Sequence, residues 1–294
     1  MRLWIMAARP RTLPAAIAPV LVGTAAAVEH VDDIRLAAFF AALVGSIFIQ
    51  IGTNLANDYS DARRGADSAD RLGPVRVTSS GLVAPRRVLV ATWVAFGIAV
   101  AAGIYLATVA GVVILIVGAV SILAGVLYTG GPRPYGYAGL GEVFVFLFFG
   151  LVAVNGSYYV QLERLDWLPF GLSLAIGFLA AAILVVNNVR DIDTDRRAGK
   201  MTLAVRLGRQ GTRNLYASLV GGAFVTVPIV LVATGGSAWC LLILLATPLV
   251  HRPLTAVMTR TDGPALNGAL AGTGALLAAF SLLLTAGLLI ATWT

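Results

Sequence analysis

The chain has few charged residues, a single cysteine and a single lysine. Charged residues make up 12% of its 294 residues, about half of the share found in soluble globular proteins. Because Cys240 is the only cysteine, an intrachain disulfide and any metal site built from cysteines are excluded. No stretch is polar enough for a separate soluble domain, and 59% of the residues are hydrophobic. The composition therefore predicts one all-α, polytopic membrane domain over residues 1–294.

Long apolar runs fill most of the sequence. A transmembrane helix needs about 20 apolar residues, and the eighth run is the weakest because it is short and contains Pro248. The first run could be read as a signal peptide, but Pro14 and Pro19 interrupt it and further spans follow. We expect nine transmembrane helices, near residues 12–28, 36–56, 88–107, 110–128, 139–160, 169–189, 215–234, 237–252 and 266–290.

The cationic residues are unevenly distributed between the two sides of this predicted bundle. With a cytoplasmic N-terminus, 19 of the 21 Lys and Arg residues fall on the inside, and only Arg35 and Arg164 fall outside. This is the positive-inside asymmetry of membrane proteins. It accounts for the net charge of +7 without a nucleic-acid partner. We expect the two long loops, 57–87 and 190–214, to face the cytoplasm.

Two acidic clusters stand where the second and sixth spans end, at residues 54–61 and 187–195. Ionisable groups beside hydrocarbon are costly and indicate a functional site. Side chains at i, i+3, i+4 and i+7 line one side of a helix. Each helix end therefore presents an amide and two carboxylates in a row: Asn54, Asp58 and Asp61 in the first cluster, and Asn188, Asp191 and Asp195 in the second.

Oxygen ligands of this kind suit Mg²⁺, which completes its coordination shell with water and substrate phosphate. Two facing clusters would hold Mg²⁺ against a diphosphate, with Asp67 and Asp193 as further oxygen donors. The alternative is that these carboxylates only cap helices and pair with loop arginines. Cationic side chains would contact the phosphate oxygens directly, and the candidates are Arg63, Arg64, Arg71, Arg76, Arg133, Arg190 and Lys200.

A metal-bound diphosphate beside a membrane fits two classes of reaction. One transfers a phosphoryl or phosphatidyl group, although the Asp-Gly and Ala-Arg arrangement of phosphatidyl transferases is not found here. The other ionises an allylic diphosphate in a dry pocket and alkylates an acceptor. An ion-coupled transporter is a further alternative, but it predicts carboxylates near the middle of the membrane. Aromatic faces stabilise a carbocation, and the candidates are Tyr59, Tyr128, Tyr135, Tyr137, Phe144 and Phe148.

The two clusters resemble the paired motifs of the UbiA-type intramembrane prenyltransferases. Asn57-Asp58-x-x-Asp61 matches the motif of that family after its second helix, and Asp191-x-x-x-Asp195 matches the motif after its sixth. Four other stretches resemble the branch that prenylates 1,4-dihydroxy-2-naphthoate. They are residues 8–14, residues 73–81, residues 128–142 and residues 200–208. The third Asp of the general motif is shifted here to Asp67, and Arg133 stands in a segment where the family often carries lysine.

The resemblance implies transfer of a polyprenyl group from its diphosphate to dihydroxynaphthoate, with loss of CO₂ and diphosphate, to give a demethylmenaquinol in the inner (plasma) membrane of a bacterium. It implies no protein partner. Related acceptors, namely hydroxybenzoate, homogentisate, a porphyrin or a lipid phosphate, remain alternatives. The implied metal ligands and catalytic residues are Asp58, Asp61, Asp191 and Asp195, with Asp67 as a supporting ligand. The implied substrate-binding residues are Asn54, Asn57, Arg133, Tyr135, Asn188, Arg190 and Lys200.

The carboxylate of the acceptor requires a cation. Arg9 or Arg11, at the start of the first span, is our candidate, and the alternative is that both arginines only anchor the helix at the membrane surface. Glu142 would orient Arg or Tyr residues of the site, or would simply be an acidic residue favoured at a helix N-terminus.

Overall fold

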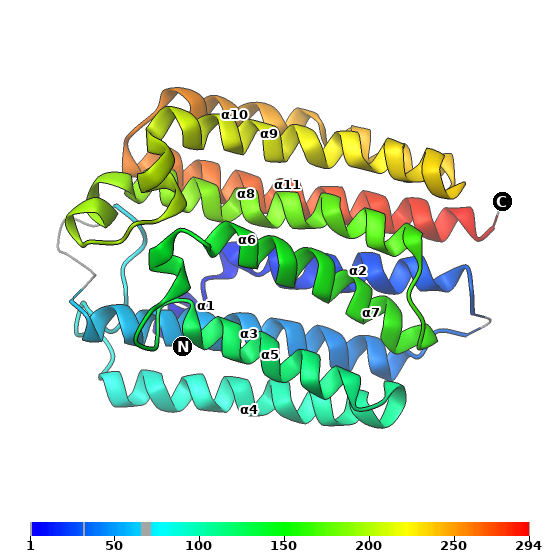
Figure 1. Cartoon of the computed structure of the whole chain (residues 1–294), viewed down its shortest axis with the longest axis horizontal. Coiled ribbons are helices and arrows are strands. Elements are labelled where there is room, and N and C mark those ends of the chain that lie inside the picture. The colour runs from blue at the N-terminus through cyan, green and yellow to red at the C-terminus, as the bar shows by residue number, and fades with distance from the viewer. Residues whose placement is uncertain (1, 32, 66–71, 294) are drawn as a thin grey trace.

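The computed structural model describes residues 2–31, 33–65 and 72–293. Every regular element within these ranges is helical, and the elements run side by side along one axis (Figure 1). The all-α prediction is therefore confirmed. The longer helices are α2 (Pro14–Val28), α3 (Leu36–Arg63), α4 (Pro85–Ala110), α5 (Val113–Leu127), α8 (Trp167–Arg197), α9 (Leu203–Thr234), α10 (Pro248–Thr259) and α11 (Gly263–Ala291).

Each of the nine predicted spans has a helical counterpart, but not all counterparts are single long helices. Six helices among the described residues are long and apolar enough to cross a membrane, and two bent pairs raise this number to eight. The remaining candidate, α5, has only 15 residues. The bent pairs are the first span, where proline residues interrupt the helix, and the eighth, where η4 (Ala238–Ala246) meets α10 at 48°. The cytoplasmic orientation of the N-terminus stays a prediction.

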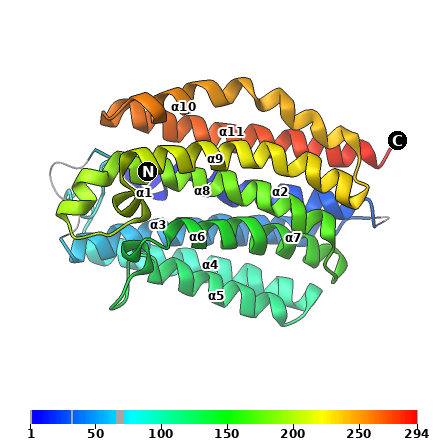
Figure 2. The same cartoon turned by 45° about the horizontal axis from the view of Figure 1, so that its top comes forward.

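The helix α8 lies at the centre of the bundle. In its most apolar window 78% of the residues are buried, against 22% for α3. Its neighbours α2, α9 and α11 pack around it (Figure 2). Ala175, Ile176 and Leu179 have no exposed surface and belong to the main hydrophobic core. The second acidic cluster is thus carried on the most deeply buried of the candidate membrane-spanning helices among the described residues.

A π-helical stretch interrupts the helix opposite α8. The segments α6 (Gly141–Val145), η3 (Phe146–Val152) and α7 (Ala153–Leu162) form one continuous span. A Cβ added at Gly150 would lie 2.6 Å from the Cα of Gly177, so two glycines let this span approach α8 closely. Such π-helical turns often occur next to functional sites, and here the stretch carries aromatic side chains toward a cavity.

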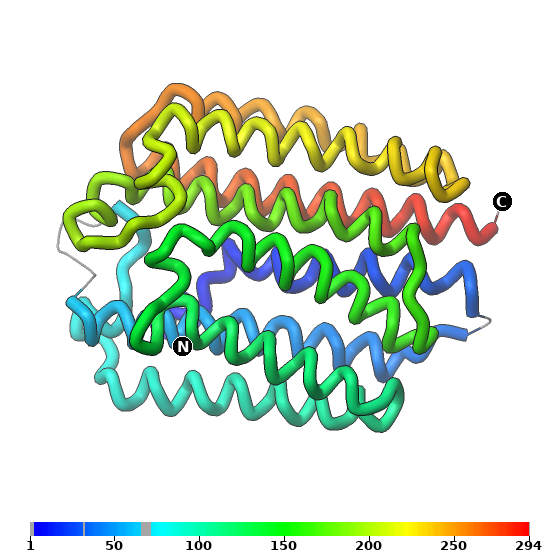
Figure 3. The backbone as a smooth tube through the Cα atoms, in the orientation of Figure 1, coloured from blue at the N-terminus to red at the C-terminus, as the bar shows by residue number. Residues whose placement is uncertain are grey.

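The two acidic clusters lie at the same end of the molecule. The helices α3 and α8 both end there, and the segments 72–84, 128–140 and 198–202 gather around their C-termini (Figure 3). The expectation that two sequence-distant clusters meet on one face of the bundle is met by this arrangement.

Candidate active site

A cavity of about 570 Å³ opens between the ends of α3 and α8. Its polar end carries Asp58, Asp61, Asp191, Asp195 and Lys200, so both predicted clusters line the same space. From there the cavity continues between α3, α4, α5 and α7 with an apolar lining. A polar head and an apolar tail can therefore be bound together in one continuous space.

Asp58 is fixed by the loop that precedes α4. Its carboxylate is 2% exposed and accepts hydrogen bonds from the backbone N–H groups of Val77 and Thr78, both at 3.1 Å. These two N–H donors fix both oxygens of the carboxylate. Each oxygen still has a second lone pair to offer a metal ion. The position of Asp58 is thus set before any ligand arrives.

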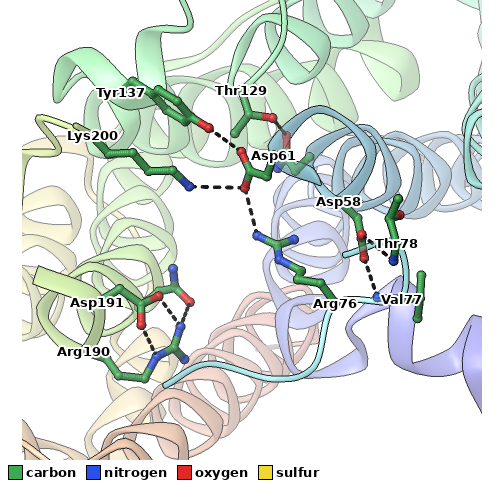
Figure 4. Close-up of polar contacts among 12 residues, drawn as sticks. Asp58, Asp61, Arg76, Val77, Thr78, Thr129, Tyr137, Arg190, Asp191 and Lys200 are labelled. Carbon is green, nitrogen blue, oxygen red and sulfur yellow. Dashed lines mark hydrogen bonds and ion pairs between the residues drawn. The ribbon is translucent and has the colours of Figure 1, made fainter. Parts of the chain in front are cut away.

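Asp61 lies at the centre of the polar contacts (Figure 4). Its Oδ1 accepts a hydrogen bond from the Tyr137 hydroxyl at 2.6 Å. Its Oδ2 lies 3.3 Å from Nη2 of Arg76 and 3.5 Å from Nζ of Lys200. The Lys200 ammonium also lies 4.8 Å from the centre of the Tyr137 ring, within the range of a cation–π contact. Residues from three separate segments therefore neutralise and orient one buried carboxylate.

Asp191 faces this group from α8 and is held by its own neighbour in the chain. Arg190 is 1% exposed and forms a two-pronged contact with Asp191, from Nε at 2.8 Å and from Nη2 at 2.6 Å. The same guanidinium donates to Asn187 at 2.8 Å and to Asn267 of α11 at 2.7 Å. Arg190 is not among the residues that line the cavity. It lies behind Asp191 and positions it.

The three predicted amides have different partners. Asn57 accepts a hydrogen bond from the Thr129 hydroxyl at 2.9 Å, and Asn188 donates to Glu142 at 2.8 Å. Because Glu142 accepts from the Nδ2 group, the orientation of the Asn188 amide is set by this contact. Glu142 thus orients a residue of the site, although that residue is Asn188 rather than an Arg or a Tyr. Asn54 donates to the segment before α2.

Not every predicted side chain reaches the cavity. Arg133 is exposed and lies outside the lining, and Asp67 falls outside the described residues. Asp193 is also outside the lining: its carboxylate is 65% exposed and pairs with Arg209 at 2.9 Å. Arg9, Arg11 and Tyr135 do line the cavity. The metal-binding role of Asp67 and the phosphate contact of Arg133 stay predictions.

An aromatic wall flanks the polar end. Tyr135 stacks on Phe144 at 3.9 Å between ring centres, and Phe148 stacks on Phe144 in turn at 6.1 Å. Tyr128 meets Tyr135 edge-on. Burial raises the pKa of Tyr135, in the loop that follows α5. Its phenol therefore stays neutral at physiological pH and adds no charge beside the carboxylates.

Comparisons with known proteins agree with this geometry. Residues 16–264 match the model of the UbiA prenyltransferase family. The chain belongs to that family. It is 46% identical to the 1,4-dihydroxy-2-naphthoate octaprenyltransferase of Mycobacterium tuberculosis, over 92% of this chain and 91% of that protein. It is 39% identical to the enzyme of the same name from Escherichia coli, over 99% and 96% of the two chains. The resemblance drawn from the motifs is confirmed.

The fold is also that of the family. The structure of a UbiA homolog from Archaeoglobus fulgidus bound to DMAPP and Mg²⁺ matches with a TM-score of 0.65 and 13% identity, over 96% of this chain and 98% of that one. An apo UbiA homolog from Aeropyrum pernix matches with a TM-score of 0.65 and 16% identity, over 95% and 96%. At such low identity the similarity shows the fold alone.

The donor set of the UbiA-type cavity suits Mg²⁺. Its candidate ligands are all oxygens, from four carboxylates and neighbouring amides, as a hard divalent cation requires. No three acidic, His or Cys side chains within the described ranges converge on a single point. A divalent ion here would therefore take few protein ligands and complete its shell with water and phosphate, which is the usual preference of Mg²⁺.

Several contacts of this UbiA-type site could not be seen in the sequence. Gln50 and Asn267 had no motif to mark them, yet Gln50 bonds Thr12 and Asn267 bonds Arg190. Thr12 and Thr129 lie in two of the branch-specific stretches, but those stretches did not show that Thr12 bonds Asn54 or that Thr129 bonds Asn57. Arg76 was a candidate for contact with phosphate and Tyr137 for contact with the carbocation. In the structure both donate hydrogen bonds to Asp61.

The buried pair of Arg190 and Asp191 yields a stability prediction. Replacing Arg190 with Met should destabilise the protein by about 3–5 kcal/mol, because a buried carboxylate loses its partner. The matched change Arg209→Met removes an exposed pair and should cost about 1 kcal/mol or less. Thermal unfolding in detergent measures both. Equal losses in the two variants would contradict a structural role specific to Arg190.

Proposed function

We propose that the protein transfers a polyprenyl group from polyprenyl diphosphate to 1,4-dihydroxy-2-naphthoate, with release of diphosphate and CO₂, giving a demethylmenaquinol for menaquinone synthesis. The observation that carries this proposal is the single cavity with four aspartates at one end and an apolar channel behind them. The naphthoate acceptor is supported by relatives of that name, up to 46% identical over most of the chain.

The enzyme is a multi-pass protein of the bacterial inner membrane, with nine spans and the cavity mouth on the cytoplasmic side. The asymmetry of Lys and Arg supports this orientation. A cytoplasmic mouth admits the diphosphate head from water, while the channel receives the tail within the bilayer.

The residues that would hold Mg²⁺ are Asp58 and Asp61 on α3 and Asp191 and Asp195 on α8, with Asp67 in support. When bound, Mg²⁺ supplies Lewis-acid neutralisation of the departing diphosphate. Lys200, which already contacts Asp61 at the polar end, binds the diphosphate with Arg76, and Arg133 adds a further contact. Arg190 contributes by holding Asp191. Asn57 and Asn188 contribute by joining their helices to Thr129 and Glu142 in neighbouring segments.

The acceptor attacks beside the aromatic wall. The ring carbon that bears the carboxylate forms a bond to the terminal allylic carbon as that carbon's bond to diphosphate breaks. CO₂ then leaves from the carboxylate, and the electron pair of the broken carbon–carbon bond restores the aromatic ring. A carboxylate of the first cluster takes the hydroxyl proton of the acceptor as general base during the attack and returns it to that oxygen when the ring is restored. Tyr135, Phe144 and Phe148 exclude water from the developing cation and present their ring faces to it.

Two aspartate variants test the diphosphate site. Asp58→Asn and Asp191→Asn should each lose at least about 100-fold in product formation, because an amide is a poor substitute for a carboxylate in a site that neutralises charge. Asp193→Asn is the matched control from the same helix as Asp191, and it should retain activity because Asp193 lies outside the cavity. The assay uses folded protein in detergent with a polyprenyl diphosphate, Mg²⁺ and dihydroxynaphthoate. Full turnover by either cluster variant would refute the metal assignment at that cluster.

Arg9 tests the acceptor site. Arg9→Ala should raise the KM for dihydroxynaphthoate about tenfold or more while changing the KM for the prenyl donor little, since a charge-assisted hydrogen bond contributes about 1.5–3 kcal/mol. Steady-state kinetics with each substrate varied in turn separates the two. Equal effects on both KM values would rule out a contact with the acceptor carboxylate.

The channel makes a prediction about chain length. Ala42 precedes Asp61 by 19 residues on α3, roughly 28 Å of helix, and both line the cavity. A Cβ at Gly156 of α7 would meet no atom within 4 Å, although Gly156 lines the channel.

Gly156→Leu should therefore project into the channel and lower kcat/KM for long prenyl diphosphates far more than for short ones. Gly97→Leu is the control, because Gly97 has similar free space but lies outside the cavity. Equal losses for long and short donors would contradict this path for the tail.

A further inference from the structure

The first span bends sharply next to the cavity. The helix α1 (Arg2–Ala8) is followed by Arg9 and by the short turn η1 (Pro10–Thr12), and the segment Leu3–Thr12 meets α2 at 51°. Arg9 has φ 54° and ψ 68°, a left-handed conformation that residues with side chains rarely adopt. Such a conformation persists only where the surroundings impose it, and it is frequent at functional sites.

The turn is closed by the backbone N–H of Thr12, which donates to the Arg9 carbonyl at 2.9 Å, and the Thr12 hydroxyl links it to α3. The Oγ1 of this hydroxyl donates to the carbonyl oxygen of Arg9 at 3.0 Å. It also accepts hydrogen bonds from Nε2 of Gln50 at 3.0 Å and from Nδ2 of Asn54 at 3.3 Å. A hydroxyl has one donor and two acceptor positions, and all three are used here. The second N–H of Asn54 donates to the carbonyl of Ala8 at 3.0 Å.

These contacts tie the turn to the helix that carries the first acidic cluster. Gln50, Asn54 and Asp58 follow one another at intervals of four residues on α3 and share a helix face. All three line the same cavity as Arg9 and Thr12. Gln50 is 8% exposed and Asn54 is 4% exposed, so both amides are largely buried. The turn that carries Arg9 is thus tied to the helix that carries Asp58 by the Thr12 hydroxyl and by the contact of Asn54 with Ala8.

We propose that Thr12 is a positioning residue for the acceptor: its hydroxyl, locked by Gln50 and Asn54, sets the left-handed turn that presents Arg9 to an aromatic carboxylate. The proposal rests on the acceptor assigned under the proposed function. It also gives Asn54 a definite task, which is to hold the turn rather than to bind phosphate. Loss of the hydroxyl removes the acceptor of one N–H group on each of two buried amides and weakens the link between the turn and α3.

The test compares Thr12→Val with Thr12→Ser. Valine keeps the shape and removes the hydroxyl, whereas serine keeps the hydroxyl. Thr12→Val should raise the KM for dihydroxynaphthoate about tenfold, the effect of about 1.4 kcal/mol, with the KM for the prenyl donor within about twofold of wild type. Thr12→Ser should restore the KM for the acceptor to within about twofold.

Inhibitors distinguish positioning from a general loss of structure. Against Thr12→Val, the Ki of 2-naphthoate, which carries the carboxylate, should rise about tenfold, while the Ki of 1,4-dihydroxynaphthalene, which lacks it, should stay unchanged. If Thr12→Val does not fold, Gln50→Met removes one of the two amides and should shift the same Ki in the same direction. Equal shifts for both inhibitors, an unchanged KM for the acceptor, or failure of serine to restore it would overturn the proposal. None of these outcomes affects the activity of the wild-type protein, so they overturn only the role of Thr12. A wild-type protein that does not prenylate dihydroxynaphthoate would overturn the proposed function itself.

Discussion

The structure depends on the neutralisation of carboxylates that are buried at the end of a membrane-spanning helix. Asp58 and Asp61 are each 2% exposed, and a buried charge without partners would cost several kcal/mol. The partners come from three segments that are remote in sequence: the loop before α4, the η2 turn (Tyr135–Ala138) and the residues just after α8. These segments are stabilised over the end of the bundle by their contacts with the buried carboxylates. Together they form the polar end of the cavity.

The same requirement explains why the two clusters are held differently. The first cluster is held by backbone N–H groups and by side chains from other segments, whereas Asp191 of the second is held by Arg190 on the central helix. Arg190 in turn reaches α11 through Asn267. The first cluster therefore depends on loops, and the second on the packed core. A site that brings the two clusters together thus places its reacting groups between loop segments on one side and the packed helices on the other.

The sequence predicted the elements better than their partners. Apolar runs and helical spacing predicted the helices and the shared faces of Asn54, Asp58 and Asp61, because both signals are local. Asp193 was expected as a further oxygen donor because it is close to the second cluster in the sequence, but it lies outside the cavity lining and pairs with Arg209. Arg190 was expected to contact the phosphate, but it lies behind Asp191 and binds that carboxylate. The contacts of Thr12 and Thr129 join segments about 40 and 70 residues apart, and no local pattern reports such distances. The short α5 and the bent first and eighth spans show the same limit, since hydropathy records apolar length and not helix geometry.

The central claim is that the aspartates of α3 and α8 hold one diphosphate between them, with its tail in the apolar channel. The most direct measurement is an experimental structure of the protein with Mn²⁺ in place of Mg²⁺ and a non-reactive prenyl thiodiphosphate, in which anomalous scattering locates the metal. Our account predicts manganese peaks between Asp58 and Asp61 on one side and Asp191 and Asp195 on the other, with the prenyl tail beside Gly156. Manganese or diphosphate bound elsewhere, with these four carboxylates still engaged only by Arg, Lys and backbone groups, would contradict it.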